Sequence, residues 1–395
     1  MFFIFSTTVL MIVYIYWRAL RPLRCKPLLK GLLWLFLLVA GLKFPVFLLV
    51  FGSLVSPNLP EPVLLVWGWG HGALVLYALI LFLRDGLLLL RFVLRRIHLL
   101  IMRGKKSEKA PNPFAEAADY ALSLWPVAGF VLACCLSLWG IHQALRVPEV
   151  RTVSIELPSL PADLEGFRIV QLSDSHIGPL LRADWAREVV LRVNETRPHL
   201  IVLTGDIVDG LPSQLAQDVA PLQGLKARYG VWGCAGNHEY YRDFQSWQAA
   251  FPSLGIHMLY NEHTVLQVGH KQIVLAGVTD AVAGHSGLPQ PDVRAALGNA
   301  PTDVPSILLA HRPDIIEQAR AAGVDIQLSG HTHAGQLAPL QGLVSFFNDG
   351  FVQGLYTLGA TQLYVSSGTG LWTGFPLRVG TTSAIVELVL HTQDD

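Results

Sequence analysis

Cysteine is scarce in this chain, with 4 among 395 residues. Cys134 and Cys135 are adjacent inside an apolar run, Cys25 lies in a basic stretch, and Cys234 lies in an apolar, strand-like run. None of them has the CxxC spacing of a thiolate zinc site, and nothing in their positions indicates a disulfide framework. We therefore expect four free thiols, most of them buried.

The whole chain also has no net charge, but its two parts carry opposite net charges. The first 150 residues hold 15 Lys+Arg and 6 Asp+Glu, a net of +9, and the remaining 245 hold 14 and 23, a net of −9. Eleven of the 14 histidines lie in the acidic part, which has no basic stripe with stacking aromatics. We therefore expect a basic, apolar part, an acidic, water-soluble part, and no nucleic-acid-binding module.

Long apolar runs are confined to the first part. A bilayer crossing needs about 20 apolar residues. Because basic residues follow the first run rather than precede it, an anchor is favoured over a cleaved signal peptide. We predict a transmembrane domain over residues 1–147, set in the lipid bilayer with about four spans. The expected spans are residues 2–16, 31–55, 63–83 and 122–145.

The loops between these runs determine the expected orientation. Residues 17–30 and 84–109 are rich in Lys and Arg, whereas residues 56–62 have neither. The positive-inside rule places the basic loops in the cytoplasm. Residues after about 148 are then expected on the outer side of the inner membrane, in the periplasm or outside the cell.

Residues 86–102 have a different pattern. Leucines and isoleucines recur there at helical spacing, with Arg91, Arg95 and Arg96 between them. We interpret this segment as a basic amphipathic helix that lies on anionic lipid. The alternative is a fifth crossing, which would invert the orientation of everything that follows.

A linker is expected over residues 148–163, which are rich in proline and polar residues. The domain beyond it, residues 164–395, alternates apolar runs with helix-like segments such as 184–196. Near-continuous apolar runs between helices indicate the buried strands of an α/β protein. The expected strands are 168–172, 200–204, 231–235, 273–278, 307–310, 326–328, 363–365 and 384–390.

Polar motifs follow five of these runs directly. They are Ser173-Asp174-Ser175-His176, Gly205-Asp206-Ile207-Val208-Asp209, Gly236-Asn237-His238-Glu239, His311-Arg312-Pro313 and Gly330-His331-Thr332-His333. Ligand sites in α/β sheets gather at the carboxyl ends of strands, so we expect these side chains to meet in one crevice. A glycine before a ligand permits a tight turn. Each motif alone is a weak signal, but five in this order are hard to assemble by chance.

The ligand types limit the metal. Imidazole and carboxylate ligands without a thiolate suit Mn, Fe, Zn, Co or Ni more than Ca or Mg. Ligands two residues apart, as in Asp174-x-His176, can reach one ion from a turning backbone. A carboxylate at a strand end, such as Asp206, can bridge two ions. We therefore expect divalent transition-metal ions at this site.

The whole motif series resembles the calcineurin-like metallophosphoesterase superfamily, over about 220 residues and without departure at any motif position. Residues 236–241, 311–313 and 329–336 are similar in detail to its membrane-associated or exported bacterial branch. The resemblance implies a four-layer αββα sandwich, with two mixed sheets flanked by helices. It also implies two metal ions and hydrolysis of a phosphate ester or anhydride.

The resemblance further implies a role for each site residue. His238 would act on the leaving oxygen, and Asp209 would orient His238 through a hydrogen bond. Two ions would clamp the phosphoryl group and lower the pKa of a bridging water. The implied ligands are Asp174, His176 and His333 for one ion, Asn237, His311 and His331 for the other, and Asp206 as the bridge.

The substrate is far less defined. The apolar segments 334–360 and 371–376 are either walls beside the site or ordinary loops packed on the core. Four spans and a short linker favour a phosphorylated lipid or a lipid-linked headgroup. The alternatives are a general phosphodiesterase with a passive anchor, and a non-catalytic membrane sensor or scaffold. The complete ligand set argues against the second alternative.

Overall fold

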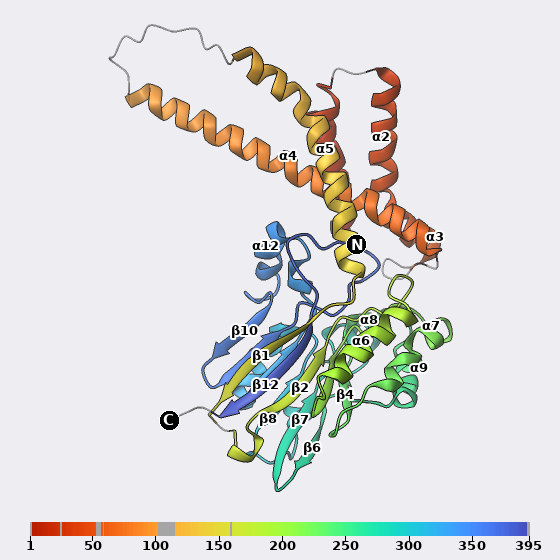
Figure 1. The fold of residues 1–395 in the computed structure, drawn as a ribbon, viewed down its shortest axis with the longest axis vertical. Helices are drawn as coiled ribbons and strands as arrows, with labels where there is room; N and C mark the ends of the chain where they lie inside the picture. The colour runs from red at the N-terminus through yellow and green to blue at the C-terminus, as the bar shows by residue number, and fades with distance from the viewer. Residues whose placement is uncertain are drawn as a thin grey trace. The chain divides into compact units, whose positions relative to one another are not determined.

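The computed structural model describes residues 2–23, 26–52, 57, 59–101, 115–158 and 160–392. The chain forms two compact units, one made of Met1–Leu54 and Pro62–Ile141, the other of Val55–Glu61 and His142–Asp395. The first unit is helical and the second contains both sheets (Figure 1).

The cysteines are less buried than the sequence led us to expect. Cys234 is buried, Cys134 is half-buried and Cys135 is exposed, and all three are free thiols. Cys25 lies outside the described residues.

The first unit supports fewer membrane spans than expected. Within the described residues, Glu61–His98 and Trp125–Leu145 are long and apolar enough to cross a membrane. α2 and α3, bent by 48° at their junction, provide a third if the pair is one broken span, and the first apolar run is a shorter helix. The expected count of four is therefore not confirmed. The helices are α1 (Phe2–Ile15), a π-helical turn (Tyr16–Leu20), α2 (Pro27–Gly41), α3 (Lys43–Phe51), α4 (Glu61–Ile101) and α5 (Ala115–Leu145).

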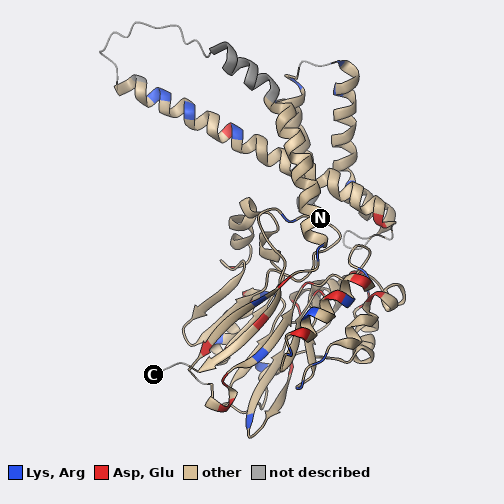
Figure 2. Ribbon diagram, in the orientation of Figure 1, with Lys and Arg blue, Asp and Glu red and all other residues tan. Residues whose placement is uncertain are grey.

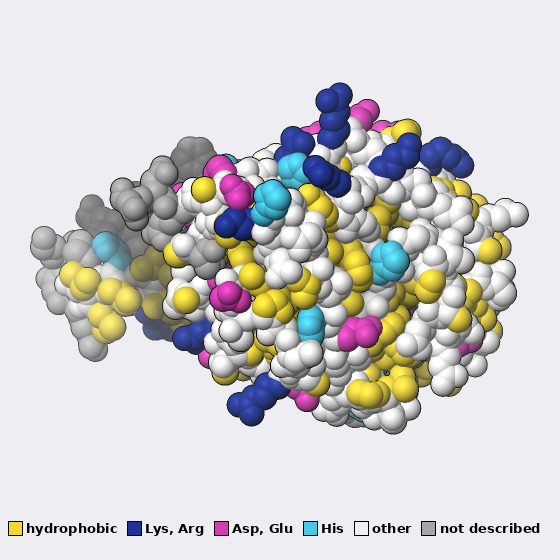
Figure 3. Space-filling view, turned by 90° about the horizontal axis from the view of Figure 1, so that it is seen from below, with side chains coloured by type: hydrophobic (Ala, Val, Ile, Leu, Met, Phe, Trp, Pro, Cys, Tyr) yellow, Lys and Arg dark blue, Asp and Glu magenta, His cyan; other side chains and the backbone are white. Residues whose placement is uncertain are grey.

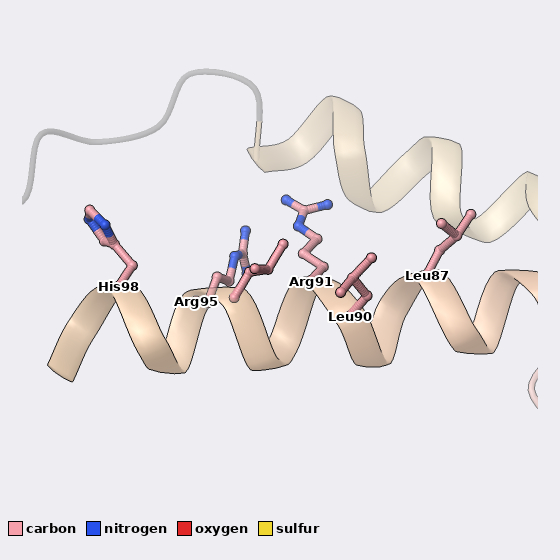
Figure 4. Close-up of a pocket in the computed structure, with 6 residues that line it drawn as sticks. Leu87, Leu90, Arg91, Arg95 and His98 are labelled. Carbon is pink, nitrogen blue, oxygen red and sulfur yellow. The ribbon is translucent and has the colours of Figure 1, made fainter. Parts of the chain in front are cut away.

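The helix expected over residues 86–102 is present up to Ile101, but it is not a separate element. α4 runs without a break for 41 residues, so this segment is the continuation of the third predicted span. Gly86 at the expected boundary costs a helix only about 1 kcal/mol relative to alanine, which does not end it. The basic pattern itself is present, as blue bands in the later half of α4 (Figure 2). Leucines, Arg91, Arg95 and His98 line an open groove there (Figure 4).

The second unit contains two six-stranded mixed sheets, so the predicted α/β class is confirmed. β2 to β5 run parallel in the first sheet, and β7, β8, β9 and β11 run parallel in the second. The first sheet has the order β1 (Val150–Leu157), β12 (Ile385–Thr392), β2 (Phe167–Leu172), β3 (Leu200–Thr204), β4 (Val231–Cys234), β5 (Ile256–Met258). The second has the order β10 (Gly354–Leu358), β11 (Thr361–Val365), β9 (Ile326–Ser329), β8 (Ser306–Leu309), β7 (Lys271–Gly277), β6 (Glu262–Val268).

Helices connect these strands. The α-helices are α6 (Ala183–Glu195), α7 (Pro212–Val219), α8 (Asn237–Arg242), α9 (Phe244–Ala250), α10 (Val293–Leu297), α11 (Ile316–Ala321) and α12 (Gln341–Phe346). Short 3-10 helices occupy Ala162–Leu164, Ala220–Gly224, Phe251–Leu254, Ala281–Ser286, Pro313–Ile315, His333–Gly335 and Ala338–Leu340.

Three apolar clusters define the layers of the second unit. Val170 of β2 packs with residues of α6 on the outer side of the first sheet. Its neighbour Ile169 points the other way, into a cluster with Leu328 of the second sheet, because successive side chains on a strand alternate. Leu308 packs with Ile316 on the outer side of the second sheet. The unit is thus layered as helix, sheet, sheet, helix, as the resemblance implied.

The linker expected over residues 148–163 is wrong for its larger part. Residues 150–157 form β1, which pairs in parallel with all eight residues of β12. Ile155 and Leu157 are buried in the cluster between the two sheets. The polar residues that suggested a linker belong to the exposed side of an edge strand.

Both signs of charge are spread over the second unit, whereas the helices of the first are mostly uncharged (Figure 2). On the face shown in Figure 3, apolar, acidic and histidine side chains are interspersed in the middle, and Lys and Arg lie toward its edges.

Candidate metal centre

The five polar motifs lie where five parallel strands end. β2, β3 and β4 are neighbours in the first sheet, and β8 and β9 are neighbours in the second. Each motif begins at or within two residues of its strand's carboxyl end. The two sheets face each other, so these strand ends deliver their side chains to one place.

Asp174, His176 and His333 form one buried group. Their ligand atoms lie within 4.8 Å of one another. The Nε2 atoms of His176 and His333 are 3.2 Å apart, and His333 Nε2 is 3.3 Å from Asp174 Oδ1. Two imidazole nitrogens and a carboxylate oxygen that converge in this way fit a single transition-metal ion.

Asp206, His311 and His331 form a second group within the same limit. His311 Nδ1 lies 2.9 Å from the carbonyl oxygen of Thr204, which can only accept, so Nδ1 donates and Nε2 is left as the ligand atom. Nε2 is 3.3 Å from Asp206 Oδ2. Among the described side chains, it is one of the buried polar atoms without a hydrogen-bond partner, which is costly unless a cation binds there.

The Asp206 carboxylate belongs to the second group and lies beside His176 of the first. Its Oδ2 is 3.3 Å from His311 Nε2, 3.7 Å from His238 Nε2 and 3.9 Å from His176 Nε2. Asp206 also forms a further candidate group with His176 and His238. The positive charge of the neighbouring histidines outweighs burial, which acts in the opposite direction, and holds the pKa of Asp206 well below its usual range. An ionised carboxylate in this position suits a bridge between two cations.

Asp209 connects two histidines. Its Oδ1 is 2.6 Å from His238 Nδ1 and 3.0 Å from His176 Nδ1, and its Oδ2 accepts from the Thr373 amide. Burial raises the pKa of Asp209, but His176 and His238 lower it by more. The structure therefore puts Asp209 beside His238 as expected, and also behind the predicted ligand His176.

His238 is almost fully buried, and its Nε2 faces the shared carboxylate. Burial lowers the pKa of His238, but Asp206 and Asp209 more than offset this and raise it to about 9. Aromatic rings flank it: Tyr241 at 5.3 Å and Trp372, edge-on, at 6.1 Å between ring centroids. Trp372 belongs to the segment 371–376, for which a wall beside the site was one of the two expectations.

Asn237 begins α8 and reaches the second group through Arg312. Its Oδ1 accepts from an Arg312 nitrogen at 3.3 Å, and another Arg312 nitrogen is 3.0 Å from His331 Nε2. The buried Asp280 forms an ion pair with Arg312, with 2.8 Å between Asp280 Oδ2 and Arg312 Nε. Arg312 is part of the His311-Arg312-Pro313 motif, but chain spacing alone does not indicate its position beside two predicted ligands.

Glu239 is a buried residue next to the site that the sequence motif contained but did not explain. It is fully buried, and its carboxylate accepts four backbone N–H groups, from Asp206, Ile207, Val208 and Gly236, at 2.7–3.2 Å. It thereby joins the loop after β3 to the turn before α8. Both segments carry predicted site residues.

Arg378 is the other residue that was missed. Its guanidinium is fully buried and donates to the carbonyl oxygens of His333, Ser367 and Gly370. It lies about 45 residues beyond the last motif along the chain, so no local pattern signals it.

The backbone at the ligands is strained. Asp174, His176, Asp206, His331 and His333 all have positive φ, between 47° and 71°. Such residues cost energy and cluster at functional sites. Gly205 has φ 82°, and a Cβ there would lie 2.7 Å from His311 Nδ1. At Gly330 the reason differs from the expected turn, because a Cβ would overlap the Ser173 hydroxyl and the Asp174 carboxylate.

Two neighbouring groups of buried His and Asp side chains that could hold metal ions fit the class of metal-dependent hydrolases. Residues 167–335 match the family model of calcineurin-like phosphoesterases. Together with the relatives below, this shows that the chain belongs to the calcineurin-like metallophosphoesterases and is a metal-dependent phosphoester hydrolase.

The relatives include membrane proteins. The chain is 36% identical over 310 residues to a "Transmembrane protein with metallophosphoesterase domain" of Danio rerio, covering 75% of this chain and 68% of that protein. It is 36% identical over 265 residues to an "Uncharacterized metallophosphoesterase" of Helicobacter pylori, covering 66% and 69%. Among solved structures, a 5'-nucleotidase precursor from Thermus thermophilus aligns with a TM-score of 0.36 and 15% identity, covering 52% of this chain and 49% of that one. The chain thus spans about half of that structure's length.

Proposed function

We propose that the second unit hydrolyses phosphoesters at a centre of two divalent transition-metal ions, of the Mn, Fe, Zn, Co or Ni kind. The observation that carries this proposal is the Asp206 carboxylate, which lies between two groups of ligand atoms. The ligands would be Asp174, His176 and His333 for one ion, Asn237, His311 and His331 for the other, and Asp206 for both.

Bound at these residues, the ions supply Lewis acidity to the phosphoryl oxygens and lower the pKa of water at the centre. The chain's own residues handle the proton. His238 Nδ1 donates to Asp209. Burial lowers the pKa of His238, but Asp206 and Asp209 raise it to about 9, so the ring is an imidazolium whose Nε2–H faces the site and can protonate the leaving oxygen. Arg312, held by Asp280, offers its guanidinium to the phosphoryl group beside Asn237. No protein nucleophile is needed.

We also propose that the hydrolase domain lies on the outer side of the membrane and acts on a phosphorylated lipid or lipid-linked headgroup. The basic loops that precede the domain support its location on the outer side, because the positive-inside rule places those loops in the cytoplasm. The apolar helices of the first unit support a lipid substrate, because they would keep the catalytic unit beside the bilayer. A general phosphodiesterase with a passive anchor is the competing function.

Two substitutions separate metal binding from proton transfer. Asp206→Asn is expected to abolish hydrolysis of an aryl phosphate and an aryl phosphodiester, because the bridging charge is lost. His238→Ala is expected to lower the rate by about 10²–10⁴-fold, the usual contribution of one general acid. Wild-type rates in both variants would contradict the site assignment.

The lipid substrate is tested with the detergent-solubilised chain. Its turnover of lipid phosphoesters is compared with that of soluble phosphoesters, with Asp206→Asn as the blank for each. Faster hydrolysis of the lipid substrates is expected. Equal or faster hydrolysis of soluble nucleotides would instead favour the passive anchor.

A further inference from the structure

Three large apolar side chains are exposed on α12 and at the residue that follows it. Leu343 is 52% exposed, Phe346 77% and Phe347 66%. The rings of Phe346 and Phe347 meet edge-on at 5.3 Å between centroids. These three residues are called the α12 tip below.

The chain around the tip carries no charge. From Ala334 to Asn348 there is no Asp, Glu, Lys or Arg, and Asp349 is the first charged residue. Water-facing surfaces usually separate exposed apolar side chains with charged ones, and contiguous apolar patches mark contact with another apolar phase. The tip therefore has the composition of a contact surface.

The tip is connected to the metal centre through its own backbone. Gln341, the first residue of α12, donates to the Ala334 carbonyl at 3.1 Å, one residue beyond the ligand His333. At the other end of the segment 334–352, the Val352 carbonyl accepts a hydrogen bond from the Thr332 hydroxyl at 2.5 Å. Residues 334–352 thus leave and rejoin the chain at the segment that holds His331 and His333.

We propose that the α12 tip inserts into the acyl region of the lipid bilayer that anchors this chain. The same polypeptide carries helices long and apolar enough to span a membrane, so the second unit is tethered to any bilayer that these helices cross. Uncharged helix ends with adjacent aromatic rings suit the membrane interface. Insertion would hold the segment that carries His331 and His333 close to the membrane surface.

A second copy of the chain is a poorer occupant of this surface. Two phenylalanines bury roughly 150–250 Å² each. A stable protein interface buries about 800 Å² per partner, which is more than the two rings of the tip provide.

Membrane contact by the tip does not depend on which phosphoester is hydrolysed.

Depth-dependent quenching tests the proposal on the full chain. The four native cysteines are replaced, Phe346→Cys is labelled with an environment-sensitive fluorophore, and the protein is placed in phosphatidylcholine–phosphatidylglycerol vesicles with or without nitroxide-labelled acyl chains. Leu191→Cys is the matched control, because Leu191 on α6 is also 52% exposed. Leu343→Cys is a second probe of the tip, with the same exposure as the control.

We expect a blue-shifted emission and at least threefold stronger quenching at positions 346 and 343 than at 191. Equal quenching at all three positions, or fluorescence changes that follow cross-linking of two copies through position 346, would overturn the proposal. Hydrolysis of a soluble aryl phosphate by each labelled protein reports the metal centre separately, because none of the three residues belongs to it.

Discussion

Glu239, Asp280 and Arg378 are buried charged side chains that lie behind the predicted ligands rather than among them. Each holds a segment that carries a site residue. Groups of this kind orient metal ligands, and replacing them typically lowers metal affinity about 10–100-fold. We therefore expect the geometry of the centre to depend on buried residues that are not among the predicted ligands.

Glu239→Gln tests this dependence. The Glu239 carboxylate accepts hydrogen bonds from four backbone N–H groups. The amide of glutamine has the same size, but its NH₂ group cannot accept a hydrogen bond, so at least one of the four bonds is lost. We expect a metal dissociation constant about 10–100-fold higher, measured by competition with a chelator. Glu195→Gln, at an exposed position on α6, is the control and should bind metal like the wild type. Unchanged affinity in Glu239→Gln would remove this residue from the support of the centre.

The residues named from the sequence all lie in one cluster, although their roles stay predictions. They could be found because each follows a buried strand directly and belongs to a ligand type. Glu239 stood in a quoted motif, but its partners are backbone N–H groups, most of them about 30 residues earlier, which no side-chain pattern reveals. Arg378 has carbonyl partners for the same reason.

At the scale of the element, the strands divide by their position in the sheets. All eight strands expected from apolar runs are present. The four that the sequence did not indicate, β1, β5, β6 and β10, are the edges of the two sheets. Edge strands are partly exposed, so their apolar residues do not form a continuous run. Burial on both faces is what makes a strand visible in the sequence.

We propose that β1 is the true start of the hydrolase domain. Ile155→Ala should then destabilise it by roughly 2–5 kcal/mol, because a fully buried side chain is truncated in the inter-sheet core. The melting temperature of the full chain in detergent should fall by roughly 2–4 °C per kcal/mol. Ser154→Ala, on the exposed side of the same strand, is the control. If the two variants melted alike, residues 150–157 would behave as the linker first expected.

At the scale of the whole molecule, charge and hydropathy predict a membrane part and a water-soluble part, and the structure has two compact units. The number of spans was harder to predict. Helical periodicity does not distinguish a span followed by a surface helix from one long helix, and α4 has only Gly86 at the expected junction. Topology therefore depends on the loops more than on the helices themselves.

Thiol labelling in intact cells tests the proposed orientation. In a chain without its native cysteines, Asp184→Cys on the second unit should react with a membrane-impermeant maleimide, because the Asp184 side chain is 97% exposed. Lys26→Cys, at an exposed position in the first basic loop, should react only after the cells are permeabilised. The opposite pattern would place the hydrolase in the cytoplasm and reverse the proposed orientation. Protection of both positions in intact cells would also place it there, with an even number of crossings between them.

The metal content of the purified full chain tests the central claim most directly. Elemental analysis after dialysis should find close to two transition-metal ions per chain in the wild type, since the Asp206 carboxylate lies between two groups of candidate ligands. His238→Ala should keep both ions, and Asp206→Asn should lose most of the metal. A wild-type protein that takes up no transition metal, or an Asp206→Asn variant that keeps its full content, would contradict a dinuclear centre at these residues.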